Sequence, residues 1–96
     1  MKGPSFEWDD AKNTLNQRKL EVSFYEAQHA FLDSKRVIAK DLAHGQKEQR
    51  YYCFGSNEGG TGILTVRFTH HSGRIRIIGA GYWRKGKRVY EQTNSI

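Results

Sequence analysis

Four runs rich in β-branched and aromatic residues, between positions 36 and 80, constrain the fold of this chain more than any other feature. They cover residues 36–42, 49–55, 63–70 and 74–80, and short turn-rich segments separate them. Short connections between successive strands favour antiparallel pairing. The sequence therefore predicts a four-stranded antiparallel meander.

The residues before these runs predict a short strand and a first helix. Residues 6–8 fit a very short strand. Asp9 or Asp10 suits the N-cap of a polar helix over residues 11–19, because a carboxylate there accepts hydrogen bonds from the first free backbone N–H groups.

Two further helices are indicated, one before the meander and one after it. Ser23 and Glu26 have the spacing of a capping box, which starts a helix over residues 24–31 with apolar side chains on one side. Residues 83–93 close the chain as a basic helix or an extended tail, since Gly86 weakens the helical pattern. The predicted fold class is α+β, with the helices packed on one face of the sheet.

Length, cysteine content and hydropathy indicate one small intracellular domain. The 96 residues suffice for a single core, so residues 1–96 are expected to form one domain. Cys53 is the only cysteine, which excludes an internal disulfide, fits a reducing cytoplasm and suggests a small buried apolar residue. Neither a signal-peptide core nor an apolar stretch of about 20 residues occurs, so we expect a soluble protein without a membrane span.

Positive charge is concentrated in the second half of the chain. The formal net charge is +6; residues 1–48 hold equal numbers of basic and acidic side chains, so residues 49–96 supply all of it. This asymmetry indicates nucleic acid, an anionic membrane or an acidic protein as partner, although a merely soluble basic protein is the alternative. The densest cluster comprises Arg74, Arg76, Arg84, Lys85, Lys87 and Arg88.

Strand alternation predicts that some of this charge shares a face. Arg67, Arg74 and Arg76 fall on one side of the last two runs, opposite their apolar residues. Like charges across neighbouring strands repel by up to about 1 kcal/mol per pair, so we expect an anion to face them. The alternative is pairing with acidic side chains from the first half of the chain, namely Glu7, Asp9 or Asp41.

Residue types and spacings leave few catalytic chemistries open. Cys53 stands alone and His70 and His71 point to opposite faces of a strand, so no zinc site is predicted. The glycine-rich residues 55–62 fit a hairpin loop better than a phosphate loop, because no Lys-Ser/Thr pair and no helix follow. Metal-independent RNA cleavage stays feasible. The RNA supplies its 2′-hydroxyl, and the protein positions the phosphate, stabilises its charge and moves two protons.

The candidate site residues follow from these roles. Arginines hold the phosphate, while Lys, His or Tyr transfers protons; Tyr82 and Trp83 either stack on an unpaired base or pack the last helix against the sheet. The catalytic candidates are Lys19, His44, Arg67, Arg76, Tyr82 and Arg84, with His70 and His71 as further proton-transfer candidates. The RNA-binding candidates are Arg50, Arg74, Trp83, Lys85, Lys87 and Arg88.

Ordered segments over nearly the whole chain match a known family. They read FEWDDAK at 6–12, Asn16, RK at 18–19, VSFYEA at 22–27, FLD at 31–33, EQRYY at 48–52, Gly55, LTVRFT at 64–69 and RIRII at 74–78. Together they resemble BrnT-type toxins of bacterial type II toxin–antitoxin systems. The resemblance implies a RelE-like fold and an endoribonuclease that inhibits growth or translation, with no cofactor. It also implies a cognate BrnA-like ribbon-helix-helix antitoxin, through whose complex the toxin reaches operator DNA.

Two segments differ from the family pattern. Lys19-Leu20-Glu21 stands where the family usually has Lys-His-Gly, and Gly79-Ala80-Gly81 stands where it has Ser-Ala-Arg. Arg84 or Tyr82 is then expected to supply the missing groups. Two alternatives to a ribonuclease remain. One is a catalytically weak or inactive module that binds its antitoxin in an operator-DNA complex, and the other is a general single-strand binder that uses Tyr82 and Trp83.

Overall fold

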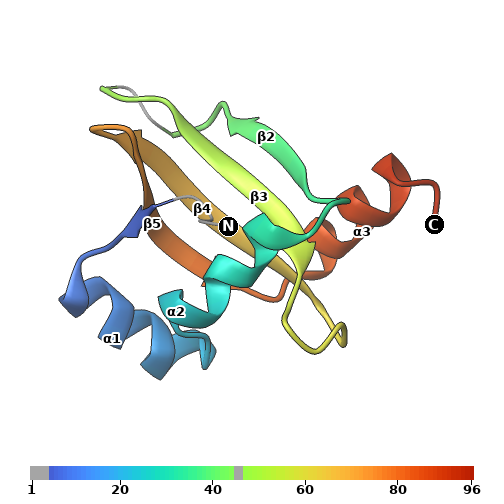
Figure 1. The fold of residues 1–96 in the computed structure, drawn as a ribbon, viewed down its shortest axis with the longest axis horizontal. Helices are drawn as coiled ribbons and strands as arrows, with labels where there is room; N and C mark the ends of the chain where they lie inside the picture. The colour runs from blue at the N-terminus through green and yellow to red at the C-terminus, as the bar shows by residue number, and fades with distance from the viewer. Residues whose placement is uncertain (1–4, 45–46) are drawn as a thin grey trace.

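The computed structural model describes residues 5–44 and 47–96, which form a five-stranded sheet with helices on both faces (Figure 1). The sheet order is β1-β5-β4-β3-β2; β2 to β5 form the predicted antiparallel meander, and β1 lies parallel to β5. The elements are β1 (Phe6–Glu7), α1 (Asp10–Leu20), α2 (Phe24–Ala27), the 3₁₀ helix η1 (Gln28–Leu32), β2 (Val37–Asp41), β3 (Arg50–Ser56), β4 (Ile63–His71), β5 (Arg74–Gly81) and α3 (Arg84–Thr93). The predicted α+β class is confirmed. No helix within the described residues is long and apolar enough to cross a bilayer.

Side-chain caps start the two N-terminal helices where the sequence predicts them. The Asp9 carboxylate accepts a hydrogen bond from the Lys12 backbone N–H at 3.0 Å, and the Ser23 hydroxyl accepts one from the Glu26 backbone N–H at 3.0 Å. The second predicted helix is divided, because its α-helical turn tightens into η1 after Ala27.

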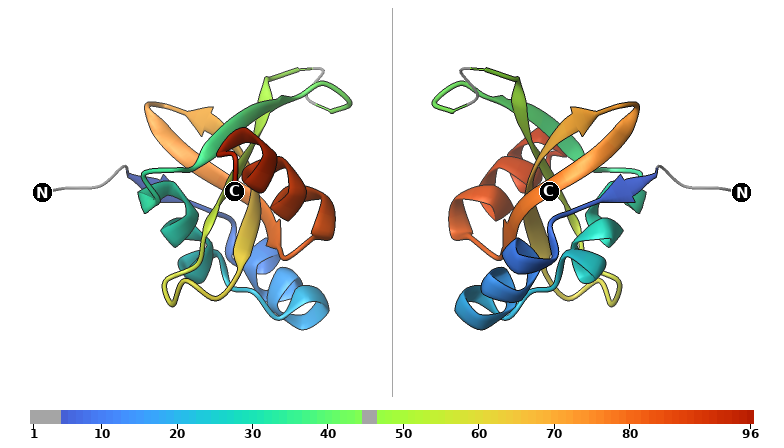
Figure 2. Two further views of the ribbon diagram at one scale, coloured as in Figure 1. Left: turned by 90° about the vertical axis from the view of Figure 1, so that its right-hand side faces the viewer. Right: turned by 90° about the vertical axis from the view of Figure 1, so that its left-hand side faces the viewer.

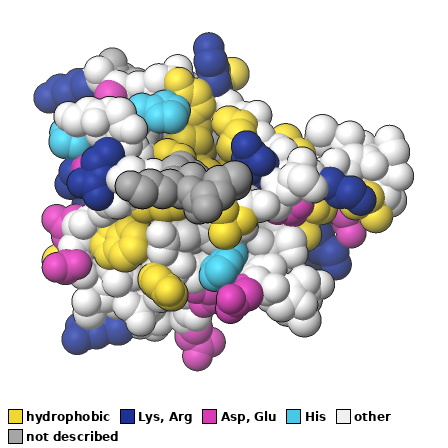
Figure 3. All heavy atoms as spheres, in the orientation of Figure 1, with side chains coloured by type: hydrophobic (Ala, Val, Ile, Leu, Met, Phe, Trp, Pro, Cys, Tyr) yellow, Lys and Arg dark blue, Asp and Glu magenta, His cyan; other side chains and the backbone are white. Residues whose placement is uncertain are grey.

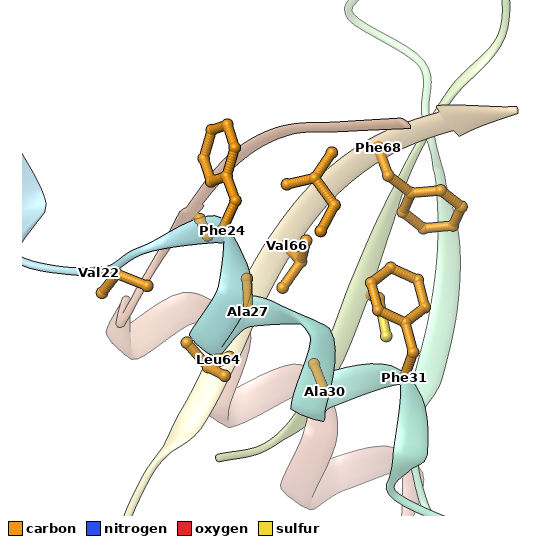
Figure 4. Packing of buried hydrophobic residues seen from close by; sticks show 11 residues of the cluster. Val22, Phe24, Ala27, Ala30, Phe31, Leu64, Val66 and Phe68 are labelled. Atoms are coloured by element: carbon orange, nitrogen blue, oxygen red, sulfur yellow. The ribbon is translucent and has the colours of Figure 1, made fainter. Parts of the chain in front are cut away.

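One face of the sheet carries the hydrophobic core, as the alternation predicts. Side chains from α2 and η1 point toward β4 in the close view of Figure 4, and the Phe31 and Phe68 rings meet edge to face with centroids 5.0 Å apart. The buried cluster consists of Val22, Phe24, Ala27, Ala30, Phe31, Cys53, Leu64, Val66, Phe68, Ile77 and Ala80. Cys53 is fully buried, and this burial raises the pKa of its thiol to about 12.

Helix α3 packs on the opposite face, so the prediction that all helices share one face is wrong. Figure 2 shows α3 and α2 on the two sides of the sheet. The contact is made by Gly86, against Thr65 and the Phe54 ring. At the other end of the helix the Tyr90 hydroxyl donates to Asp33 at 2.7 Å, and this bond raises the pKa of Tyr90 to about 12. The glycine that weakens the helical pattern is therefore the residue that docks the helix.

A tight turn and a bulge shape the β4–β5 hairpin. Ser72 and Gly73 both have positive φ (52° and 76°), as a two-residue type I′ turn requires. Farther along, Phe68 pairs with Ile77 but Arg67 pairs with Gly79, so Ile78 is an extra residue in β5. Such a bulge bends the strand and increases its twist.

Replacing Gly86 by Ala is expected to destabilise the fold by about 1–3 kcal/mol. Alanine usually stabilises a helix relative to glycine by up to about 1 kcal/mol. Here, however, the added methyl group would lie 3.0 Å from the Phe54 ring and overlap the Thr65 hydroxyl, so α3 must move away. Urea unfolding of Gly86→Ala measures the change, with Gly59→Ala as control, since a methyl group at Gly59 meets Thr61 at no less than 3.8 Å. Equal or greater stability of Gly86→Ala would contradict this packing.

Candidate nucleic-acid interface

The strand register places charged side chains in rows across the sheet face that α3 partly covers. Directly paired residues point to the same face, and one row runs through all five strands as Asp41, Arg50, Thr69, Arg76 and Glu7. The next row is Ala39, Tyr52, Arg67 and Gly79. Arg74 pairs with His71 at the hairpin end of the same face. We call the surface formed by Arg50, Arg67, Arg74 and Arg76 the basic face.

Glu7 neutralises part of the basic face. Its carboxylate lies 2.8 Å from Arg76 Nη1, 2.8 Å from His71 Nδ1 and 3.6 Å from Arg74 Nη1. Arg74 also donates hydrogen bonds to the Ser5 hydroxyl and the Phe6 carbonyl. Of the acidic side chains proposed as partners for these arginines, Glu7 is the one that pairs with them. Glu7 therefore neutralises Arg74 and Arg76, and the predicted cross-strand repulsion is further limited because Arg67 pairs with Gly79 and not with an arginine.

The electrostatic surroundings of Glu7 favour its charged form. Loss of solvent alone would raise the pKa of this carboxyl group, but the hydrogen bonds and positive charge of His71 and Arg76 outweigh it and lower the pKa below its ordinary value. A carboxylate held in this way links β1 to β5 and fixes the orientation of the His71 ring.

Arg67 lies in a different environment, a cavity of about 560 Å³ between the end of α1, β5 and α3. Within residues 5–44 and 47–96, Arg67 has no ion-pair or hydrogen-bond partner, unlike Arg74 and Arg76. Its Nη2 atom would lie 3.9 Å from a methyl group built on Gly79, so the guanidinium extends over that glycine. The lining comprises Asn16, Leu20, Tyr52, Phe54, Thr65, Arg67, Ile78, Gly79, Ala80, Trp83, Lys85, Gly86 and Val89.

The second glycine of the Gly79-Ala80-Gly81 segment supports Trp83. A methyl group on Gly81 would come within 2.7–3.0 Å of three carbons of the indole ring, so the ring lies against the strand backbone. Trp83 is nevertheless 47% exposed. The positions where the resemblance leads us to expect a serine and an arginine are thus covered by the side chains of Arg67 and Trp83.

Some predicted site residues lie away from this cavity. The Tyr82 hydroxyl donates to Glu26 at 2.8 Å and accepts from Asn57 at 3.2 Å, and loss of solvent together with Glu26 raises the pKa of Tyr82. His44 is paired with Asp41 at 3.1 Å, beside the edge strand β2. His70 points to the core side, with its ring 5.7 Å from that of Phe68. Lys19 is exposed in the last turn of α1. Their catalytic roles remain predictions.

The basic residues of α3 crowd its N-terminal half. Arg84, Lys85, Lys87 and Arg88 are all exposed, and no acidic side chain lies in the first turn of the helix. Positive charge at this end opposes the helix dipole. The structure therefore brings Lys85 and Trp83 to Arg67, while the other three cations extend the positive surface along the helix.

Two residues of this region were missed by the sequence analysis. Tyr52 pairs with Arg67 and lines the cavity, and a register drawn between the second and third strands would have found it. Asn16 also lines the cavity, and its amide bonds the backbone of Val22 and Ala80; only its place in the family pattern marks it in the sequence. Among the described residues, no group of three or more His, Cys, Asp or Glu side chains is arranged to hold a metal ion.

The surface on the α1–α2 side has a different character. In the space-filling view of Figure 3, Lys and Arg side chains are interspersed with Asp and Glu over this side of the molecule. Mixed charge of this kind favours solubility more than binding of a polyanion. The basic face and the cavity beside α3 are therefore the candidate interface.

Replacing Glu7 by Gln is expected to destabilise the protein at neutral pH and to have a decreasing effect as the pH falls. The pKa of Glu7 is lower in the folded state than in the unfolded chain, so its ion pairs contribute stability above an unfolded pKa of about 4.3. This contribution is lost as the pH falls through the lower, folded pKa. Urea unfolding of wild type and Glu7→Gln across this range measures it. Glu48→Gln is the control, because Glu48 is exposed and forms no ion pair within the described residues. A difference that is the same at every pH would contradict the ion-pair cluster.

Comparison with known proteins identifies the family. No curated protein sequence matches the chain. A family model described as the ribonuclease toxin BrnT of type II toxin–antitoxin systems matches residues 8–86. The matched range contains the whole meander together with Arg67, Trp83 and Lys85, and it begins just after Glu7. The chain therefore belongs to the BrnT family of ribonuclease toxins of type II toxin–antitoxin systems.

Proposed function

We propose that this protein is a toxin that cleaves RNA endonucleolytically without a metal ion, and that Arg67 holds the reacting phosphate. The observation that carries the proposal is the position of Arg67, a guanidinium that lies with Lys85 in a cavity lined by aromatic rings and has no partner among the described residues. Arginine suits this role because its planar donors match two phosphate oxygens at once.

The chemistry requires little from the protein beyond charge and proton transfer. The 2′-hydroxyl of RNA attacks the adjacent phosphorus, the bond to the 5′-oxygen breaks, and a 2′,3′-cyclic phosphate and a 5′-hydroxyl result. Arg67 and Lys85 would stabilise the negative charge that accumulates on the phosphate oxygens. The proton leaves the 2′-hydroxyl and another reaches the 5′-oxygen, so one base and one acid are needed.

His71 shares the basic face with Arg67, and Glu7 holds its ring at 2.8 Å. Four residues of β4, about 13 Å, separate His71 from Arg67, and His71 does not line the cavity. The Tyr82 hydroxyl instead donates to Glu26, and the His44 ring pairs with Asp41. Both carboxylates lie away from the cavity. None of these three candidates lines the cavity, so we assign neither base nor acid to them, and we assign phosphate binding along the face to Arg50, Arg74 and Arg76.

Family membership supports a proposal for the partners. A type II toxin is neutralised by a protein antitoxin, and we infer a BrnA-like ribbon-helix-helix antitoxin that carries the complex to operator DNA in the cytoplasm. The alternative function is a catalytically weak module that acts only by this binding. Gly79 and Gly81 favour it, because they leave the strand end without the reactive side chains that the resemblance leads us to expect.

The ribonuclease proposal is tested with purified, antitoxin-free protein and RNA in EDTA. We expect wild type to cleave and Arg67→Gln to lose about 10²–10³ in kcat, as when one donor to a developing oxyanion is removed. Arg18→Gln is the control, an exposed arginine at the end of α1 outside the cavity lining. Thermal unfolding of both variants checks that they fold.

The ends of the RNA products report the mechanism. A 2′,3′-cyclic phosphate agrees with attack by the 2′-hydroxyl, whereas a 5′-phosphate would exclude it. Intact RNA with wild type, together with no growth arrest when the protein is expressed without an antitoxin, would refute the ribonuclease proposal and favour the binding module.

A further inference from the structure

The cavity beside Arg67 presents hydrogen-bond donors that the protein itself leaves unused. Among the described residues, the Arg67 guanidinium, the Lys85 ammonium and the Tyr52 hydroxyl make no side-chain hydrogen bond or ion pair, and the lining contains no Asp or Glu. Such a lining suits a ligand that is anionic and rich in acceptors.

Three aromatic rings, those of Tyr52, Phe54 and Trp83, also line the cavity. The Tyr52 and Phe54 rings are stacked, with centroids 5.8 Å apart and planes 19° apart. The Trp83 indole lies on the backbone at Gly81, where a side chain would displace it, and stays about half exposed. A flat, supported and exposed ring is a surface on which another flat ring can stack.

From these two observations we propose that the cavity is a subsite for one unpaired nucleotide of single-stranded RNA. The base stacks on Trp83, beside Tyr52, and the adjoining phosphate binds Arg67 and Lys85. The volume of about 560 Å³ lies within the range of roughly 300–1,000 Å³ typical of sites for small organic groups. The assignment to RNA rests on the proposed function, whereas the stacking and the charge contacts rest on the cavity.

The subsite predicts a preference for unpaired over paired RNA. A base can stack on the exposed Trp83 ring only after it has left its neighbours in the duplex. An acidic peptide without aromatic residues, such as oligoglutamate, could satisfy Arg67 and Lys85 but has no flat ring for Trp83. Single-stranded RNA is therefore the partner that uses both halves of the lining.

Binding is measured with a short 2′-O-methyl RNA, in which the attacking hydroxyl is blocked so that the probe survives. The protein carries Trp8→Phe, which leaves Trp83 as the sole tryptophan and its fluorescence as a local signal. Three further probes are compared with this RNA. They are the same 2′-O-methyl strand with abasic sites, a duplex of the same sequence, and an oligoglutamate peptide. We expect quenching of Trp83 and at least about tenfold tighter binding of the single strand than of the abasic strand or the duplex.

Variants separate stacking from charge. Trp83→Ala is expected to remove the advantage of the base-containing strand, while Lys85→Ala keeps that advantage and reduces the slope of log K against log salt by about 0.7. The matched controls are Tyr25→Ala and Lys40→Ala, an exposed ring and an exposed ammonium outside the cavity, which should bind like wild type. The abasic comparison uses the Trp8→Phe protein with Trp83 present, so it decides the question even if Trp83→Ala does not fold.

Several results would overturn the subsite. These are equal binding of the abasic and base-containing strands, equal binding of the duplex, effective competition by oligoglutamate, or a Trp83→Ala protein that folds and keeps the full preference. The two proposals can fail separately. Cleavage of RNA with equal abasic binding refutes the subsite alone, whereas base-dependent binding without cleavage of unmodified RNA refutes the ribonuclease and leaves the subsite in place.

Discussion

The side-chain amide of Asn16 holds helix α1 and the segment that follows it on the end of β5. Its nitrogen donates to the carbonyls of Val22 and Ala80 at 2.8 and 2.9 Å, and its oxygen accepts from the Ala80 backbone N–H at 3.3 Å. Strand β1 pairs with β5 along two residues only, so Ala80 lies beyond the end of that pairing. The amide takes the place of a neighbouring strand at this edge and satisfies backbone groups that would otherwise need water. Because α1 buries none of its residues, apolar packing contributes little to its docking, and polar contacts of this kind position both the helix and the end of β5.

With the end of β5 fixed, the absence of side chains at three glycines shapes the candidate site. Gly86 lets α3 approach Thr65, Gly81 lets the Trp83 ring lie on the strand, and the Arg67 guanidinium extends over Gly79. At Gly86 and Gly81 the contact is closer than a side chain would allow, whereas at Gly79 a methyl group would make an ordinary contact with Arg67 at 3.9 Å. The family pattern would place reactive side chains at two of these positions. In this chain the side chains of Arg67 and Trp83 lie over these two positions, so the proposed site takes its charged and aromatic side chains from β4 and the start of α3 instead of from β5.

The sequence predicted most of what depends on neighbouring residues, and less of what depends on distant ones. Alternation identified the core face, and the caps at Asp9 and Ser23 follow from local chemistry. The face on which α3 packs was predicted wrongly, because Tyr52 and Phe54 make β3 apolar on both sides, so that its pattern does not reveal one exposed face. The bulge at Ile78 was also missed. A bulge interrupts the alternation of apolar and polar residues along a strand, but Ile78 lies in a continuous apolar run in which no alternation can be seen. No local sequence pattern indicates that a two-residue strand pairs in parallel with β5. The position of Glu7 depends on that pairing, so the sequence does not reveal it either.

The position of Glu7 decides how much of the positive charge in the sequence can act on a ligand. In the sequence, the arginines and lysines of residues 74–88 form the densest cluster of positive charge, and a polyanion is expected to bind there. In the fold, Arg74 and Arg76 both pair with the carboxylate of Glu7 in β1. This ion pairing weakens their attraction for phosphate. Arg67, which lies outside that cluster in sequence, has no such partner among the described residues and shares its cavity with Lys85. The density of basic residues along the sequence is therefore a poor guide to which of them can bind an anionic ligand. The candidate site is centred on one arginine of β4, and the cluster that dominates the sequence forms its surroundings.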